Sequence, residues 1–105
     1  MHLVIIYCRV KSNCRPAFLR SAASLCETSR GEPGNVAYGY FEDPTRPGRF
    51  AFVEEWASRQ DIDRHLAQPH TQAFLNAALD MLFEPPSMRI IEAGKVEPLE
   101  LRVSQ

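Results

Sequence analysis

Residues 50–83 of the chain read FAFVEEWASRQDIDRHLAQPHTQAFLNAALDMLF. The side chains of the first seven positions would alternate between two faces, with Phe50, Phe52, Glu54 and Trp56 on one and Ala51, Val53 and Glu55 on the other. This period of two predicts a strand over residues 49–56. Glu54 shares a face with three aromatic residues, so it would need a partner if it is buried, most simply an arginine.

Two helical segments follow this strand, and Pro69 separates them. Ser58 and Asp61 have the spacing of a capping box with Asp in the place of Glu, which predicts the start of a short helix. Pro69 suits the first turn of a second helix. Apolar residues then recur at helical spacing, at Phe74, Ala77, Ala78, Met81 and Leu82. The pair Pro85-Pro86 is expected to end this helix.

The remaining chain predicts three more strands and one more helix. The strands are expected over residues 2–10, 36–42 and 88–93, which are rich in β-branched and aromatic residues or bounded by turn signals. The helix begins at Pro16 and has an apolar stripe of Phe18, Ala22, Leu25 and Cys26. Residues 95–105 alternate apolar side chains, so they could add an edge strand to this sheet or to a partner subunit.

The order of these elements is β-α-β-β-α-β, which predicts the ferredoxin-like arrangement of the α+β class. A chain of 105 residues has room for one domain, expected over residues 1–105. Helices cover only one face of such an antiparallel sheet, and the other face must find cover. We therefore expect a homodimer in which two sheets pack against each other.

Composition and charge argue against several classes of function. The net charge is -1 and no block of like charge occurs, so we expect neither nucleic-acid nor membrane binding. The apolar run at residues 3–6 is far too short to span a bilayer. Three cysteines without a CxxC unit predict neither a disulfide framework nor a zinc ribbon, and a reducing cytoplasm suits them best.

The motifs of this chain resemble those of the antibiotic-biosynthesis monooxygenase family, which includes small bacterial quinol monooxygenases. The resemblance is carried by FAFVEEW at residues 50–56, His65-Leu66, Pro69-His70 and Phe74, and it extends from Pro16 to Ile91. It implies a dimeric α+β barrel with a pocket between sheet and helices. It also implies that dioxygen oxidises a small quinol, phenol or anthrone-like compound without flavin, metal or haem. A haem-degrading branch has Trp where His65 stands, and we disfavour it here.

Oxygenation without a cofactor needs a base to ionise the substrate, aromatic walls and a donor for the oxyanion. His65 and His70 are the candidate bases, because imidazole titrates near neutral pH. His70 is favoured, since it lies at a helix start and on the face of Phe74. The candidate walls are Trp56, Tyr38, Phe52 and Phe74. Arg49 is a candidate anion partner, as are Arg64 and Tyr40.

The sequence predicts no metal site, because His65 and His70 are five residues apart and straddle Pro69. Two other functions stay open beside the monooxygenase. One is an isomerase or other proton-transfer enzyme that uses the same histidines. The other is a stress-response module that binds a small molecule without turnover. Structural roles also explain these residues. His65 could cap a turn or donate a hydrogen bond at the break between the helices, His70 could serve the helix start, and Trp56 could be a core residue.

Overall fold

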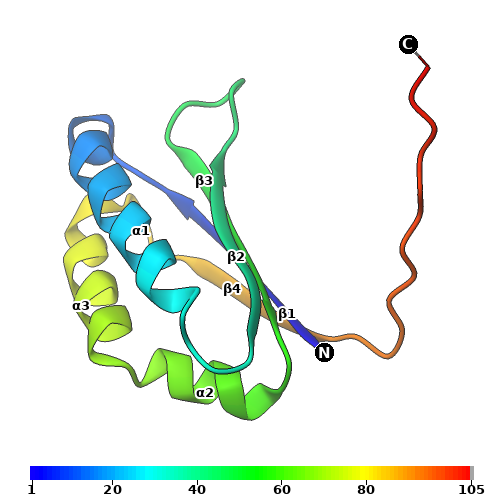
Figure 1. The fold of residues 1–105 in the computed structure, drawn as a ribbon. Coiled ribbons are helices and arrows are strands. Elements are labelled where there is room, and N and C mark those ends of the chain that lie inside the picture. Colours follow the sequence, from blue (N-terminus) through cyan, green and yellow to red (C-terminus); the bar gives the residue numbers. More distant parts are fainter. Residues whose placement is uncertain (105) are drawn as a thin grey trace.

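The computed structural model describes residues 1–104, and an antiparallel sheet of four strands forms one layer of it (Figure 1). The strands are β1 (His2–Arg9), β2 (Asn35–Glu42), β3 (Arg49–Trp56) and β4 (Ser87–Glu92). Their order across the sheet is β2-β3-β1-β4. β1 therefore lies inside the sheet, as expected for a strand that is apolar on both faces.

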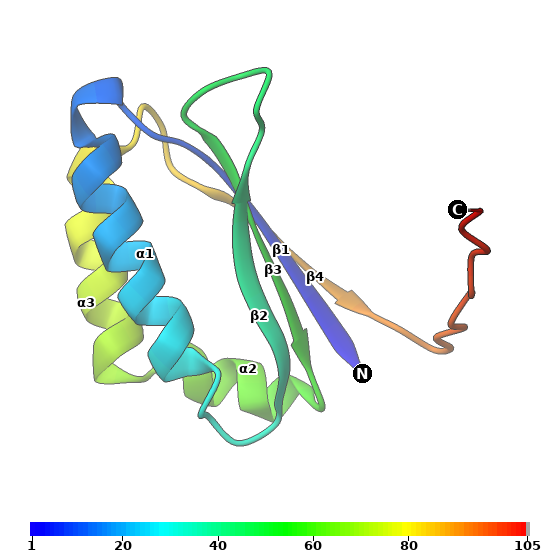
Figure 2. The same cartoon turned by 45° about the horizontal axis from the view of Figure 1, so that its top comes forward.

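The helices form the second layer, and all of them cover the same face of the sheet (Figures 1 and 2). They are α1 (Arg15–Ser29), α2 (Arg59–Leu66) and α3 (Pro69–Ala78), with short 3-10 turns η1 (Ser12–Cys14) and η2 (Leu79–Met81). This arrangement confirms the α+β, ferredoxin-like prediction, including the break between two helical segments at Pro69.

The core lies between the two layers. The predicted aromatic face of β3 points into it, and Phe50, Phe52, Glu54 and Trp56 are all at most 3% exposed. Phe18 of α1 contacts this face, with its ring centroid 5.0 Å from Phe50 and 5.9 Å from Phe74 of α3. These contacts set the distance of α1 and α3 from β3 and so define the space between the helices and the sheet.

The second helical segment ends earlier than the sequence predicts. α3 stops at Ala78 and not at Pro85-Pro86, and the chain continues as η2 and an extended segment. The backbone of this segment pairs with the end of β1: Lys11 N–H donates to Met81 O and Phe83 N–H donates to Arg9 O. These long-range hydrogen bonds take the place of helical ones. Met81 and Leu82 of the predicted apolar stripe therefore lie beyond the end of α3.

No helix within residues 1–104 covers the outer face of the sheet (Figure 2). It presents large apolar side chains, among them Tyr7, Phe41 and Val53, which are 53%, 62% and 36% exposed. Residues 95–104 form no strand, and their apolar side chains are exposed. The predicted edge strand is therefore absent from this chain's own sheet, and Gln105 lies outside the described residues. Over residues 1–104, no helix combines the length and the apolar character that crossing a membrane requires.

Candidate functional site

A cavity of about 110 Å³ lies between the inner face of the sheet and the helices. Its size is on the order of that of an apolar cavity that accepts one benzene molecule. Three of the predicted aromatic residues line it, namely Tyr38, Phe52 and Phe74. Most of the remaining wall is aliphatic, and four side chains bring polar groups to it: Tyr38, Glu54, His65 and Thr71. An apolar cavity with a few polar groups on one wall is typical of small-molecule sites.

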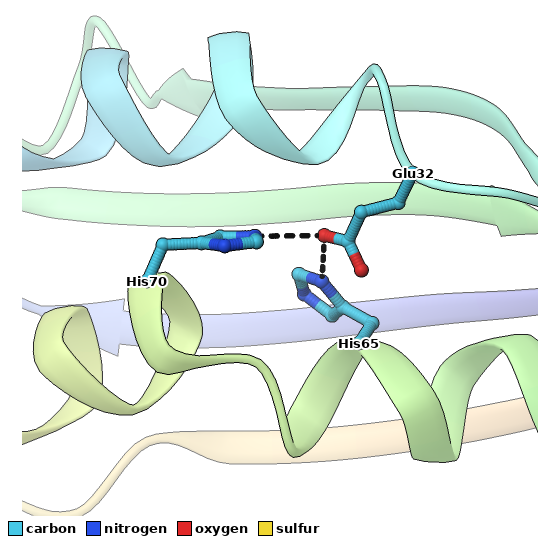
Figure 3. A group of neighbouring side chains, drawn as sticks. All are labelled: Glu32, His65 and His70. Atoms are coloured by element: carbon cyan, nitrogen blue, oxygen red, sulfur yellow. Dashed lines mark hydrogen bonds and ion pairs between the residues drawn. The ribbon is translucent and has the colours of Figure 1, made fainter.

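Glu32, His65 and His70 form a hydrogen-bonded cluster (Figure 3), and His65 is the member of it that lines the cavity. Glu32 follows α1, His65 lies near the end of α2, and His70 lies at the start of α3. One carboxylate oxygen, Oε2 of Glu32, is 2.7 Å from His65 Nδ1 and 2.9 Å from His70 Nε2. Because an ionised carboxylate only accepts, both ring nitrogens carry the proton and donate to Glu32.

The turn that follows α1 places Glu32 at this point. Glu32 N–H donates to Ser29 O and Asn35 N–H donates to Glu32 O, so the turn is closed on both sides of the residue. Ala57 N–H donates to Gly34 O and ties the turn to the end of β3. Gly34 has a φ of 80° and lies against the Asp61 carboxylate, which leaves no space for a Cβ.

The position of His65 follows from the start of α2. Ser58 caps this helix and accepts from Asp61 N–H, which confirms the predicted helix start. About two turns later, His65 is 3% exposed. Its ring centroid lies 4.8 Å from that of Trp56 and 5.4 Å from that of Tyr38. Two aromatic rings and a carboxylate therefore fix the orientation of the imidazole.

The hydrogen bond to Glu32 decides which nitrogen of His65 is free to act as a base. With the proton on Nδ1, Nε2 is the accepting nitrogen. It lies on the side of the cavity, where the Tyr38 hydroxyl donates a long hydrogen bond to it. Nε2 lies 3.4 Å from the Tyr38 hydroxyl and 4.0 Å from Glu54 Oε1. Burial lowers the pKa of His65, and the hydrogen bond to Glu32 opposes this effect. The ring is thus neutral near pH 7 and able to accept a proton.

Glu54 is 2% exposed and brings a carboxyl group to the same wall. Its Oε1 accepts from Trp56 Nε1 at 3.0 Å. Its partner is therefore this indole and not the arginine that the sequence suggested. Oε2 has no hydrogen-bond partner among the described residues. Burial raises the pKa of Glu54 to about 7, so the protonated form is well populated near neutral pH.

The other predicted site residues lie further from the cavity. Trp56 is fully buried behind Glu54 and His65 and does not line it. His70 has a side chain 27% exposed and borders a separate groove between α1 and α3. Arg49 is exposed and pairs with Arg9 in the sheet, one position from the inward Phe50, so it belongs to the outer face. The structure brings neither Arg49 nor the ring of His70 to the cavity.

Glu32 is the site residue that sequence reasoning missed. The segment Glu32-Pro33-Gly34-Asn35 is a dense turn signal, and a turn gives no reason to assign chemistry to its first residue. Glu32 and His65 are 33 positions apart, so no local spacing connects them. Nor did the spacing of the two histidines show that one carboxylate would join them.

One carboxylate and two imidazoles are also a ligand set that divalent metals use. The ligand atoms of Glu32, His65 and His70 all lie within 4.8 Å of one another. The expectation of no metal site was based on the spacing of the two histidines along the chain and did not include Glu32. In the observed arrangement, hydrogen bonds to Glu32 Oε2 join the three side chains. Measurements of activity therefore need a control for bound metal.

Comparison with known proteins gives a family and close structural relatives. The sequence model of the family described as antibiotic biosynthesis monooxygenase (ABM) matches residues 1–77. The uncharacterized protein sll1783 of Synechocystis sp. (strain ATCC 27184 / PCC 6803 / Kazusa) is 30% identical over 91 residues, 87% of this chain. The match spans only 62% of the length of that relative.

Two further relatives have monooxygenase in their names. "Putative monooxygenase YcnE" of Bacillus subtilis (strain 168) is 33% identical over 79 residues, which are 75% of this chain and 83% of that protein. A solved structure, "Putative antibiotic biosynthesis monooxygenase from Nitrosomonas europaea", superimposes with a TM-score of 0.86 at 26% identity. That superposition covers 90% of this chain and 100% of the other.

Proposed function

Because the chain belongs to the antibiotic biosynthesis monooxygenase family, we propose that it uses dioxygen to oxidise a small aromatic compound, a quinol or phenol, in the cavity beside His65. A general monooxygenase-like function is what the family and the relatives support. The substrate, the use of dioxygen without a cofactor and the roles of the residues are the proposal.

The observation that carries this proposal is the orientation of His65. Glu32 binds its Nδ1–H, so Nε2 is the basic nitrogen on the side of an apolar cavity. When Nε2 takes the proton of a substrate hydroxyl, the O–H bond breaks and an imidazolium forms. Glu32, 2.7 Å away, stabilises that positive charge as the carboxylate of a catalytic triad does. His65 is therefore the base in this proposal, and His70 helps to hold Glu32 in place.

The ionised substrate then supplies the electrons that dioxygen needs. A phenolate is electron-rich and reduces dioxygen, and the two combine in a peroxide on the ring. Cleavage of the O–O bond leaves one oxygen atom on the ring and releases the other as water. For a hydroquinone, the products are a hydroxyquinone and water, so no further reductant is required. The apolar lining of the cavity keeps bulk water from the charged intermediates.

Oxygen consumption with a panel of quinols and phenols tests this function. We expect consumption well above the autoxidation blank, a loss on the order of a hundredfold or more in His65→Ala, and a smaller loss in His70→Ala. The reaction should persist after treatment with a chelator, which controls for metal at Glu32, His65 and His70. No consumption above the blank with any substrate would refute the monooxygenase. Substrate conversion without oxygen uptake would instead favour a proton-transfer enzyme.

We also propose that two copies of the chain pack through the outer faces of their sheets. That face presents exposed apolar side chains and is not covered by the helices of its own chain. It also contains Arg89 and Glu55, whose opposite charges allow a self-complementary contact. Such packing would complete a dimeric α+β barrel and leave each cavity within one subunit.

A further inference from the structure

The cavity contains one polar atom that the fold leaves without a partner. Oε2 of Glu54 is buried and makes no hydrogen bond among the described residues, although its sister oxygen accepts from Trp56 Nε1. A buried polar atom without a partner is unfavourable, because it has lost its hydrogen bonds to water and gained none in the fold. The carboxyl group lines the cavity, so a ligand there can supply the missing partner.

Besides the Trp56 indole, His65 and Tyr38 bring polar groups close to this carboxyl group. Nε2 of His65 lies 4.0 Å from Glu54 Oε1, so a single ligand oxygen can contact both side chains at hydrogen-bonding distance. On the other sides of this point the cavity wall is mostly apolar, with Phe52 and Phe74 among its rings. A ligand with one hydroxyl on an aromatic ring fits this distribution of polar and apolar surface.

We propose that Glu54, in its protonated form, is the hydrogen-bond donor that recognises the hydroxyl oxygen of a single-ring aromatic substrate, while His65 Nε2 accepts the proton of the same hydroxyl. This inference rests on the proposed function and names its substrate class. When the proton moves, the substrate O–H bond breaks and the His65 N–H bond forms. The negative charge stays on the substrate oxygen, where the Glu54 O–H donates to it.

The size of the cavity favours one ring over several. About 110 Å³ is on the order of the space that one benzene molecule occupies in an apolar cavity. A three-ring anthrone would require the helices to move away from the sheet. Phenols and hydroquinones need no such movement.

The surroundings of Glu54 favour its protonated form near neutral pH. Burial is the largest cause of the raised pKa of about 7. The Trp56 indole and the Tyr38 hydroxyl oppose it, and the charge of Glu32 adds to it. The other titratable groups near it are His65 on α2, Tyr38 on β2 and Cys26 on α1. Burial raises the pKa of Tyr38, and that of Cys26 to about 11, so both are neutral at pH 7. Val4, opposite on β1, has no charge.

Binding of para-fluorophenol under nitrogen, followed by fluorine NMR, tests this role without turnover. At about pH 6 we expect Glu54→Leu to bind roughly tenfold more weakly than the unmodified protein, and Glu54→Gln to stay within a few-fold because its amide still donates. Between about pH 6 and about pH 8 the affinity of the unmodified protein should fall as Glu54 loses its proton, and that of Glu54→Gln should not.

Fluorobenzene is the matched control ligand, because it has the same ring and no hydroxyl. Its affinity should not depend on Glu54 or on pH in this range. Equal binding of para-fluorophenol by the unmodified protein and Glu54→Leu would overturn the inference, as would the same pH dependence in Glu54→Gln. If binding depends on Glu54 but no quinol consumes oxygen, the recognition site stands and the monooxygenase proposal fails.

Discussion

Glu32 stands at the centre of the polar cluster, and its effect on His65 can be measured through pH. The carboxylate raises the pKa of His65 against the effect of burial. Glu32→Gln can still accept both imidazole hydrogen bonds, but it has no charge to stabilise an imidazolium. We expect kcat/KM to fall on the order of a hundredfold. The acid limb of its pH profile should move to lower pH, because the pKa of His65 falls further.

Glu27→Gln is the control for this prediction, because Glu27 is exposed on α1 and does not line the cavity. It should leave both the rate and the pH profile unchanged. A Glu32→Gln variant with a lower rate but an unshifted acid limb would mean that Glu32 supports the fold around His65 and does not set its basicity.

The raised pKa of Glu54 predicts how the free energy of unfolding depends on pH. Its pKa is raised in the fold from the ordinary value of 4.5 to about 7. Between these two values the folded protein keeps a proton that the unfolded chain has released, so this group lowers the free energy of unfolding as pH rises through the window. The decrease in the free energy of unfolding that Glu54 causes is complete above about pH 7. It is absent below pH 4.5, the ordinary pKa of the group.

Glu54→Gln removes this titration but keeps an oxygen that accepts from Trp56. The free energy of unfolding of the variant, relative to the unmodified protein, should therefore increase by up to about 3 kcal/mol from about pH 4.5 to about pH 7. Urea unfolding at both ends of the range measures this difference. A difference that does not change with pH would show that Glu54 stays ionised in the fold.

At the scale of elements, the turn between α1 and β2 connects the fold to the site. Gly34 has a φ of 80°, and a Cβ there would overlap the Asp61 carboxylate in the first turn of α2. Gly34→Ala should lower the free energy of unfolding by about 1 to 3 kcal/mol. It should also lower activity, because the same turn holds Glu32.

Thermal unfolding and oxygen uptake check this prediction together. The matched control is Gly94→Ala, since an added Cβ at Gly94 meets no atom within 4 Å. That variant should match the unmodified protein in both measurements. If Gly34→Ala also matches the unmodified protein in both measurements, the turn tolerates a Cβ at this position and the prediction is wrong.

At the scale of the whole molecule, the outer face of the sheet predicts the oligomeric state. Val53 lies at the middle of this face, opposite Ile5 on β1 and Gly39 on β2. Val53→Glu would place a charge in the proposed interface, so we expect it to convert a dimer of two 11.9 kDa chains into monomers. Light scattering coupled to gel filtration measures the mass of each form.

Gln60→Glu introduces the same side chain at an exposed position of α2, on the other layer, and should leave the dimer intact. An unmodified protein that is monomeric at micromolar concentration would contradict the proposed packing. The exposed tail over residues 95–104 can be tested in the same way, because its removal weakens the dimer only if it contacts the partner.

The alternation of side chains along β3, the capping box at Ser58 and the break at Pro69 are local patterns. They determined the elements and the ferredoxin-like order, since strand and helix periods are properties of neighbouring residues. The sequence also singled out both histidines and three of the aromatic residues that line the cavity. It could not predict the end of α3, which depends on hydrogen bonds to the distant end of β1.

Only the tertiary structure decided how the site is built. Glu32 joins His65 and His70 across 33 and 38 positions, and this contact leaves Nε2 of His65 as the basic nitrogen beside the cavity. The sequence favoured His70 as the base, because its place at a helix start follows from neighbouring residues. Which imidazole ring points toward the cavity does not follow from neighbouring residues. Distances between residues far apart in the chain arise from the packing of α1, α2 and α3 on one sheet, and no local period encodes them.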